Sequence, residues 1–197
     1  MRLILASASP ARLKVLRDAG LRPEAVVSGV DEQAISAPTP LALVKALAKA
    51  KAEAVASTLP DTDLIVVGCD SVFEHGGQVF GKPQTLQRAR ERCRQLSGRS
   101  GLLHTGHHLI VRKGGSETSS NESATTKVHF GVFGDAEIEA YLATGEPLQV
   151  AGGFTFDGYG GAFVAALEGD HTNVIGISLP LLRTMLNELD VPYHSLW

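Results

Sequence analysis

The chain has 197 residues, of which 44% are hydrophobic and 20% charged, a balance typical of one compact domain with a sizeable core. Its formal net charge of -3 comes from 18 basic and 21 acidic residues, so overall charge gives no reason to expect a nucleic-acid or membrane partner. No apolar stretch approaches the ~20 residues that span a bilayer. We therefore predict a cytoplasmic protein that meets any anionic ligand with local groups.

A short strand over residues 2–6 leads into a hydroxyl-rich turn and a helix. Ser9 is the predicted N-cap of this helix, and Pro10 takes its first position. The free N–H groups at a helix start favour a phosphate, and Ser7, Ser9 and Arg12 would add two hydroxyls and a positive charge. Since most capped helix starts bind nothing, phosphate binding is a hypothesis at this point.

Carboxylates follow two of the predicted strands. Asp31 and Glu32 come after a strand over residues 24–28, and Asp70 follows the apolar run over residues 64–67, which indicates a strand buried on both faces. In open α/β sheets ligands gather at the carboxyl ends of such strands, which makes Asp70 a candidate catalytic or metal-binding group. The alternative is an aspartate that caps the strand end. Loop acids such as Glu32 are usually solvated, although they can also hold a divalent ion.

The helix predicted over residues 38–57 carries a lysine in the middle of its apolar stripe. Lys51 lies seven residues after Val44 and four before Val55, whereas Lys45 and Lys49 lie to the side. A buried ammonium is costly unless the side chain snorkels to water or meets an anion. Two interpretations follow: Lys51 snorkels, or it is an active-site lysine that reaches a phosphate.

The rest of the chain alternates strands and helices, as α/β proteins do. Gly76-Gly77 predicts a hairpin turn, after which Gly81-Lys82-Pro83 opens a helix. Cys69, at the end of the buried strand, and Cys93, on the apolar stripe of that helix, are predicted core residues. The polar segment over residues 113–121 is predicted to be a mobile loop. Helices are expected over residues 85–96, 135–143 and 180–189, and strands over residues 101–112, 122–133 and 162–167.

Several possible signals for other functions are weak. The histidines on the predicted strands, which are His104, His107, His108 and His129, lack the spacing of a zinc site, so we interpret them as structural. The arginines of the 85–96 helix are expected to form a solvated face. The glycine-rich segment over residues 145–161 matches neither the dinucleotide fingerprint nor the P-loop, which argues against a dehydrogenase or a kinase.

Six short motifs between Leu3 and about Leu189 point to one family when taken together. They are Leu5–Arg12, Gly68–Ser71, Gly81–Pro83, Leu96–Gly98, Gly145–Pro147 with Ala151-Gly152, and Glu168–Asp170 with Asn173–Gly176. In this order they resemble the Maf family, the septum-formation-inhibitor proteins that act as nucleoside triphosphate pyrophosphatases.

The resemblance implies a fold, a reaction and a cofactor. The fold is α/β and related to inosine triphosphate pyrophosphatase, with an elongated mixed sheet flanked by helices and two lobes around a groove, in a single domain over residues 1–197. The reaction is hydrolysis of a nucleoside triphosphate to the monophosphate and pyrophosphate with a divalent cation, Mg²⁺ or Mn²⁺. Family members often form homodimers, so a homodimer is possible here.

The resemblance also assigns roles to residues of this chain. Asp70 takes the catalytic aspartate, with Lys51 and Lys82 as catalytic lysines, and Glu32 joins Asp70 near the metal. The phosphate-binding turn is formed by Ser7, Ser9 and Arg12, and Asp157 is assigned to substrate binding.

Four positions depart from the family pattern. Ala11 and Val150 replace residues that are often basic, Gln149 replaces an aspartate, and Asp157 stands where Gln or Glu is common. The base preference therefore does not transfer. Two other readings stay open: a regulator of cell division that binds a nucleotide without cleaving it, and a metal-dependent phosphohydrolase that releases orthophosphate from a monophosphate.

Overall fold

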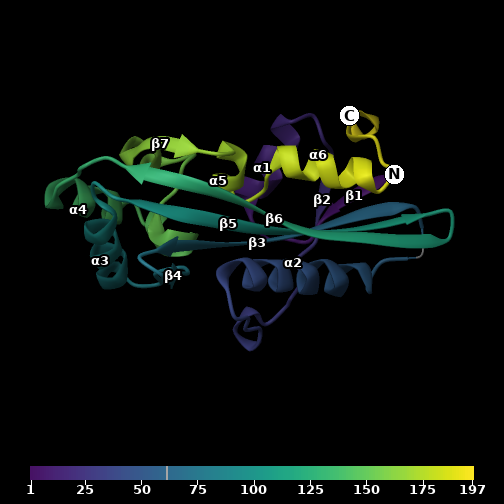
Figure 1. Ribbon diagram of the computed structural model, residues 1–197, viewed down its shortest axis with the longest axis horizontal. Helices are drawn as coiled ribbons and strands as arrows, with labels where there is room; N and C mark the ends of the chain where they lie inside the picture. Colours follow the sequence, from purple (N-terminus) through teal and green to yellow (C-terminus); the bar gives the residue numbers. More distant parts are fainter. Residues whose placement is uncertain (61) are drawn as a thin grey trace. The chain divides into compact units, whose positions relative to one another are not determined.

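The computed structural model describes residues 1–60 and 62–197, and it confirms the predicted α/β class (Figure 1). A seven-stranded mixed sheet has the strand order β2-β1-β3-β5-β6-β7, with β4 paired to β3. The chain forms two compact units: residues 1–70, 105–124 and 176–197 make the first, and residues 71–104 and 125–175 make the second. These units fit the two expected lobes, whereas the single-domain organisation and the groove stay predictions.

Most elements agree with the predicted ones within a few residues, although the short helix α5 was not predicted. The strands are β1 (Arg2–Leu5), β2 (Pro23–Ala25), β3 (Leu64–His75), β4 (Gln78–Phe80), β5 (Ser100–Lys113), β6 (Ser116–Phe130) and β7 (Val164–Glu168). The α-helices are α1 (Pro10–Asp18), α2 (Pro40–Ala56), α3 (Leu86–Leu96), α4 (Asp135–Ala143), α5 (His171–Ile175) and α6 (Leu179–Glu188). Within the described residues, no helix is both long and apolar enough to span a bilayer.

The first unit is built around the parallel strands β1, β2 and β3. Helix α2 covers one face of this part of the sheet, and α1 and α6 cover the other (Figure 1). Buried apolar residues of β1, α2 and β3, among them Ile4, Val55 and Val66, form its core. A Cβ added to Gly68 would overlap the carbonyl oxygen of Ala48 and lie 2.9 Å from the backbone nitrogen of Ala52. Gly68 therefore lets the backbone of α2 rest directly on β3.

The second unit has an aromatic core. The ring of Phe73, on β3, lies edge-on to Phe130 and Phe154, at centroid distances of 6.0 and 5.1 Å. Such edge-to-face pairs add to the apolar burial itself. Phe73 also lies against Gly101 and Gly152, where an added Cβ would meet the ring. Packing of this kind fixes the backbone of β3 beyond residue 70.

The arginines of α3 lie at the surface, as predicted, but three of them have partners there. Arg90 binds Glu139 and Arg94 binds Asp135, so two ion pairs join α3 to α4. Arg92 lies over the ring of Phe80, 5.0 Å from its centroid, and donates to the carbonyl oxygen of Gly81. A helical wheel shows that these side chains avoid the core, but it does not show what neighbouring elements offer them.

The predicted end of the buried strand was also wrong. Strand β3 continues through Asp70 to His75. Its parallel pairing with β1 ends at the Leu5 and Val67 pair, so Asp70 lies just beyond the shared ladder. The change from apolar to polar residues marks the end of this pairing rather than the end of the strand.

The predicted mobile loop over residues 113–121 is a tight hairpin instead. Gly114 and Gly115 form the turn with φ of +58° and +78°, and β6 begins at Ser116. The residues from Ser116 to Ser119 are exposed strand residues. Their polarity reflects exposure on both faces of a strand, which a composition-based interpretation confuses with a loop.

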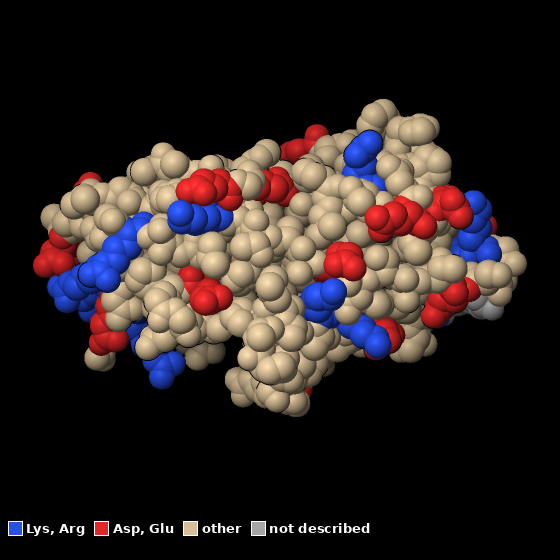
Figure 2. Space-filling view, viewed as in Figure 1, with Lys and Arg blue, Asp and Glu red and all other residues tan. Residues whose placement is uncertain are grey.

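Charges of both signs are distributed over the surface. On the face shown in Figure 2, most basic side chains lie close to acidic ones. Exposed ion pairs such as Arg2 with Glu24, Lys14 with Asp18 and Lys49 with Glu53 illustrate this arrangement. It fits the expectation that the chain has no broad electrostatic attraction for polyanions.

The contact at Gly68 leads to a stability prediction. Gly68→Ala should lower the free energy of unfolding by about 1–3 kcal/mol, because the new methyl group pushes α2 away from β3. Gly81→Ala is the matched control, since nothing lies within 4 Å of a Cβ added there. Urea unfolding followed by circular dichroism measures both variants, and equal stabilities would contradict the proposed close approach.

Candidate functional site

The turn between β1 and α1 forms as the sequence predicts. Ser9 is the N-cap of α1, and its hydroxyl accepts a hydrogen bond from the backbone nitrogen of Arg12 at 3.4 Å. The hydroxyl of Ser7 accepts from the backbone nitrogen of Ser9 at 3.1 Å. Two hydroxyls and the positive end of a nine-residue helix therefore meet in one turn.

Arg12 ties this turn to two other segments of the first unit. Its Nε donates to the carbonyl oxygen of Gly176 at 2.7 Å, and its Nη1 donates to the carbonyl oxygen of Cys69 at 2.9 Å and to Ser7 Oγ at 3.3 Å. Gly176 has a φ of +117°, and an added Cβ there would lie 2.9 Å from Arg12 Nε. Because Cys69 precedes Asp70, Arg12 fixes β3 next to the candidate catalytic residue.

Lys51 lies between two carboxylates. Its Nζ is 2.5 Å from Asp70 Oδ1 and 2.6 Å from Glu32 Oε1. Lys51 and Asp70 are only 7% and 8% exposed, whereas the Glu32 side chain is 50% exposed. The snorkelling interpretation is therefore wrong, and the lysine meets carboxylates inside the first unit. Burying the charge of Asp70 without that of Lys51, or the reverse, would cost several kcal/mol.

Glu32 reaches this pair from a short 3-10 helix, η1 (Glu32–Ala34). Asp31 caps η1, since its carboxylate accepts a hydrogen bond from the backbone nitrogen of Gln33 at 3.1 Å. The capping of η1 thus places Glu32 beside Lys51. Of the two acids that follow β2, Asp31 caps η1 and Glu32 pairs with Lys51.

The carboxylates suit a divalent cation that is shared with a substrate. Magnesium in phosphate-handling sites takes one or two protein carboxylates, and substrate phosphates and water complete its octahedron. Asp70 and Glu32 supply two carboxylates, which lie on the same ammonium group, that of Lys51, so an ion bound here would share them with that charge. Among the described residues, no group of three or more His, Cys, Asp or Glu side chains forms a self-sufficient metal site. The donor set therefore fits an ion that binds together with a triphosphate.

The other two assigned residues belong to the second unit. Lys82 lies in the connection from β4 to α3, next to Gly81, whose carbonyl oxygen accepts from Arg92. On the other side of Lys82, the backbone nitrogen of Gln84 donates to the carbonyl oxygen of Leu148 at 3.3 Å. Asp157 is exposed on a loop over residues 155–160. The catalytic role of Lys82 and the substrate contact of Asp157 stay predictions.

The histidines have structural partners. The ring of His107 is fully buried, and its Nε2 accepts from the backbone nitrogen of Ser178, the N-cap of α6, at 2.8 Å. His104 bonds to Thr125 and Glu74. Burial lowers the pKa of His108, which favours its neutral ring. These contacts fit the interpretation of the histidines as structural.

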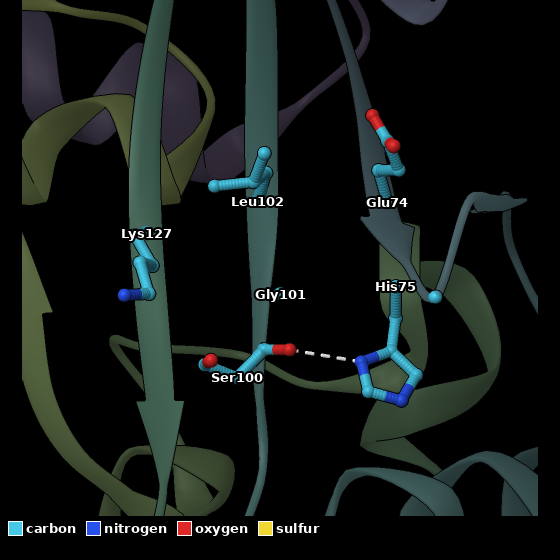
Figure 3. A pocket seen from close by; sticks show the side chains of 7 residues that line it. Glu74, His75, Ser100, Gly101, Leu102 and Lys127 are labelled. Atoms are coloured by element: carbon cyan, nitrogen blue, oxygen red, sulfur yellow. Dashed lines mark hydrogen bonds between the residues drawn. The ribbon is translucent and has the colours of Figure 1, made fainter.

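A pocket of about 270 Å³ in the second unit contains none of the assigned residues (Figure 3). Glu74, His75, Ser100 and Lys127 contribute to its lining. Their polar atoms already have partners: Glu74 binds His104, Lys127 binds Glu168, and His75 Nδ1 donates to the carbonyl oxygen of Ser100 at 2.8 Å. The size of this pocket therefore gives no guide to the chemistry of the protein.

Comparison with known proteins shows which family this chain belongs to. A family model described as "Maf-like protein" matches residues 2–189, almost the whole chain. The chain belongs to the Maf family. The resemblance carried by the six motifs is thereby confirmed.

Three relatives match this chain over its whole length. A protein of Saccharopolyspora erythraea is 52% identical over 205 residues, covering 100% of this chain and 97% of the relative. A protein of Streptomyces coelicolor is 50% identical over 196 residues, covering 100% of this chain and 94% of the relative. A protein of Mycobacterium marinum is 48% identical over 208 residues, covering 100% and 96%. All three are named nucleoside triphosphate pyrophosphatase.

The cysteine next to Asp70 should be chemically inert. Burial raises the pKa of Cys69 to about 12, although the nearby Arg12 acts in the opposite direction, and burial raises the pKa of Cys93 to about 11. Against an unperturbed value of 9.0, Cys69 at pH 8 has roughly a thousandfold less thiolate. We expect both thiols to react slowly with a chromogenic disulfide in the native protein and at once in guanidinium chloride. Rapid labelling of Cys69 without unfolding would show that β3 opens beside the site.

Proposed function

We propose that this Maf-family chain hydrolyses a nucleoside triphosphate to the monophosphate and pyrophosphate. The carrying observation is the contact of Lys51 with both Asp70 and Glu32, in the same unit as the phosphate-binding turn. A buried carboxylate bonded to a buried ammonium contributes little to stability compared with apolar packing, so its presence favours a chemical role. Relatives that cover the whole chain carry the name of this activity.

The substrate brings a charge of about -4, which must be balanced before a water can approach the α-phosphorus. The N-terminus of α1 offers backbone N–H groups, and the guanidinium of Arg12 adds a fixed charge. Arg12 is held by backbone carbonyl groups, so its charge needs no reorganisation when a triphosphate binds. The turn from Ser7 to Arg12 would accordingly orient phosphates rather than react with them.

A divalent cation, Mg²⁺ or Mn²⁺, would be held by Asp70 and Glu32 together with the triphosphate. When bound, such an ion neutralises phosphate oxygens and makes the phosphorus more open to attack. Asp70 either holds this ion or accepts the proton of the attacking water, and both roles need its carboxylate ionised. Lys51 positions that carboxylate, and the family resemblance adds Lys82 for the pyrophosphate leaving group.

The first experiment identifies the products and the role of Asp70. Purified protein is incubated with Mg²⁺ or Mn²⁺ and a panel of nucleoside triphosphates, and monophosphate, pyrophosphate and orthophosphate are measured. We expect monophosphate and pyrophosphate in equal amounts, with a loss of about 100-fold or more in kcat for Asp70→Asn, which keeps the volume and removes the charge. Unchanged turnover in that variant would remove Asp70 from the mechanism.

The same assay separates the alternatives. Nucleotide binding without turnover would identify a regulator of cell division that binds a nucleotide without cleaving it. Ala11 and Val150, which replace residues that are often basic in the family, would then be the first positions to change. Orthophosphate released from a monophosphate would identify a different class of phosphohydrolase. In both cases the proposed pyrophosphatase activity would be wrong.

A second experiment tests Lys51. Lys51→Met fits the apolar side of α2 but leaves Asp70 without its ammonium, so we expect a folded protein with reduced stability and a fall of about 100-fold or more in kcat. Lys49→Met is the matched control, because Lys49 is half exposed and pairs with Glu53, at 3.8 Å, on the same helix. Circular dichroism and product release measure both variants. A Lys51→Met protein as active as the control would show that the lysine has no part in catalysis.

A further inference from the structure

His107 is a buried residue of β5 that contacts the segment leading into α6. Side chains along a strand alternate between the two faces of the sheet. A Cβ added to Gly106 would lie 2.1 Å from the carbonyl oxygen of Val44 on α2, so Gly106 and His108 face α2. His107 faces the opposite side, which α1 and α6 cover (Figure 1). Its fully buried ring meets the backbone nitrogen of Ser178 there.

The hydrogen bonds of this ring define its tautomer. Nε2 of His107 accepts from the backbone nitrogen of Ser178 at 2.8 Å, so this ring nitrogen carries no hydrogen. The hydrogen of the neutral ring therefore lies on Nδ1, which donates to the carbonyl oxygen of Thr105 at 3.2 Å. Because one ring nitrogen accepts and the other donates, the imidazole ties β5 to the start of α6 in a single orientation.

The segment that His107 holds also carries the carbonyl group that orients Arg12. Ser178 is the N-cap of α6, and the carbonyl oxygen of Gly176, two residues earlier, accepts from Arg12 Nε at 2.7 Å. Ile177, between them, is fully buried. Since Ser178 is bound by His107 and Ile177 is packed in the core, the carbonyl group of Gly176 has little freedom to move away from the guanidinium.

Arg12 depends on such support because its side chain is long. Its Nη1 donates to the carbonyl oxygen of Cys69 at 2.9 Å and to Ser7 Oγ at 3.3 Å, and the contact of Nε with Gly176 is the shortest of these three. An arginine side chain has several rotatable bonds, and ordering it costs entropy that its hydrogen bonds must offset. Loss of the Gly176 acceptor would therefore let the guanidinium turn away from Ser7.

We propose that His107 is a positioning residue for phosphate binding: through Ser178 and Gly176, it keeps the guanidinium of Arg12 at the turn between β1 and α1. This inference rests on the proposed function and deepens it. All four residues belong to the first unit. The buried ring of His107 does not touch the substrate, and its loss weakens phosphate binding because Arg12 then takes several orientations.

Binding of inorganic tripolyphosphate tests this role without any turnover. Calorimetry without added metal gives the dissociation constant for the wild type, His107→Met and His107→Gln. Met and Gln have similar lengths, but only Gln offers an oxygen acceptor in place of Nε2. We expect the dissociation constant to rise about tenfold in His107→Met and to stay within about threefold of the wild-type value in His107→Gln.

His108→Met is the matched control. His108 is the next residue of β5 and is also buried, but it faces α2 instead of α6. We expect this variant to bind tripolyphosphate as the wild type does. Wild-type affinity in a folded His107→Met protein would overturn the inference. Equal losses of affinity in His107→Met and His107→Gln would also overturn it, since the acceptor would then have no part in binding.

A double variant tests whether His107 acts through Arg12. Arg12→Met should weaken tripolyphosphate binding, and His107→Met should cause no further loss in the Arg12→Met background. Additive losses would show that His107 supports the fold in general and would overturn the positioning role.

The tautomer of His107 tests the first contact even where His107→Met does not fold. Long-range nitrogen–proton NMR of the isotope-labelled wild type separates the two neutral tautomers, and the spectrum of His107→Gln identifies the signal by its absence. We expect the hydrogen on Nδ1. A hydrogen on Nε2 would leave Ser178 without this acceptor and would overturn the inference.

Turnover of nucleotides separates this inference from the proposed function. A wild type that binds tripolyphosphate with the expected dependence on His107, but releases no pyrophosphate from any nucleotide, would reject the proposed function and leave the link from His107 to Arg12 in place. Pyrophosphate release by a His107→Met protein with wild-type affinity for tripolyphosphate would reject the positioning role alone.

Discussion

The contact between Lys51 and Asp70 sets the conditions for the rest of the first unit. Two nearly buried charges 2.5 Å apart tolerate little displacement, because separating them leaves each in a poorly solvated place. Helix α2 and strand β3 must consequently pack closely, with little freedom to move apart. Gly68 makes that approach possible two residues before Asp70, since any side chain there would meet the backbone of α2.

Arg12 extends the same constraint to a third segment. By donating to the carbonyl oxygens of Cys69 and Gly176, it connects α1 to β3 and to the segment before α6. A guanidinium has donors in a fixed planar fork, so one residue can bind several backbone carbonyl groups from different elements. The positive charge beside the turn between β1 and α1 is therefore part of the scaffold and is fixed by backbone contacts.

Much of this arrangement could be predicted from local patterns. The period of α2 placed Lys51 among apolar residues, and the Ser9-Pro10 pair marked the start of α1, because both signals act within a few turns of one helix. The identity of Lys51's partners could not be predicted in this way. Glu32 lies 19 residues before Lys51 in the sequence and Asp70 lies 19 after it, and only the folded chain brings them together.

The sequence leaves the neighbours of surface residues unspecified for a physical reason. Residues 116–119 are polar because both faces of an exposed strand meet water, and Arg92 avoids the core, as predicted, yet covers the ring of Phe80. In each case the sequence shows which environment a side chain avoids but not which neighbour it meets.

The two carboxylates beside Lys51 differ in exposure and in the rigidity of their surroundings. Asp70 is 8% exposed, lies within a strand and is fixed by packing, whereas the Glu32 side chain is 50% exposed on a short 3-10 helix. A rigid, poorly solvated carboxylate suits a step that needs fixed geometry, such as holding a water or an ion in line with a phosphorus. A more exposed carboxylate can move without opening the core, so in the proposed reaction Glu32 would be able to follow an ion that enters and leaves with the nucleotide. The different roles proposed for these two acids follow from where the fold places them and not from their chemistry, which is the same.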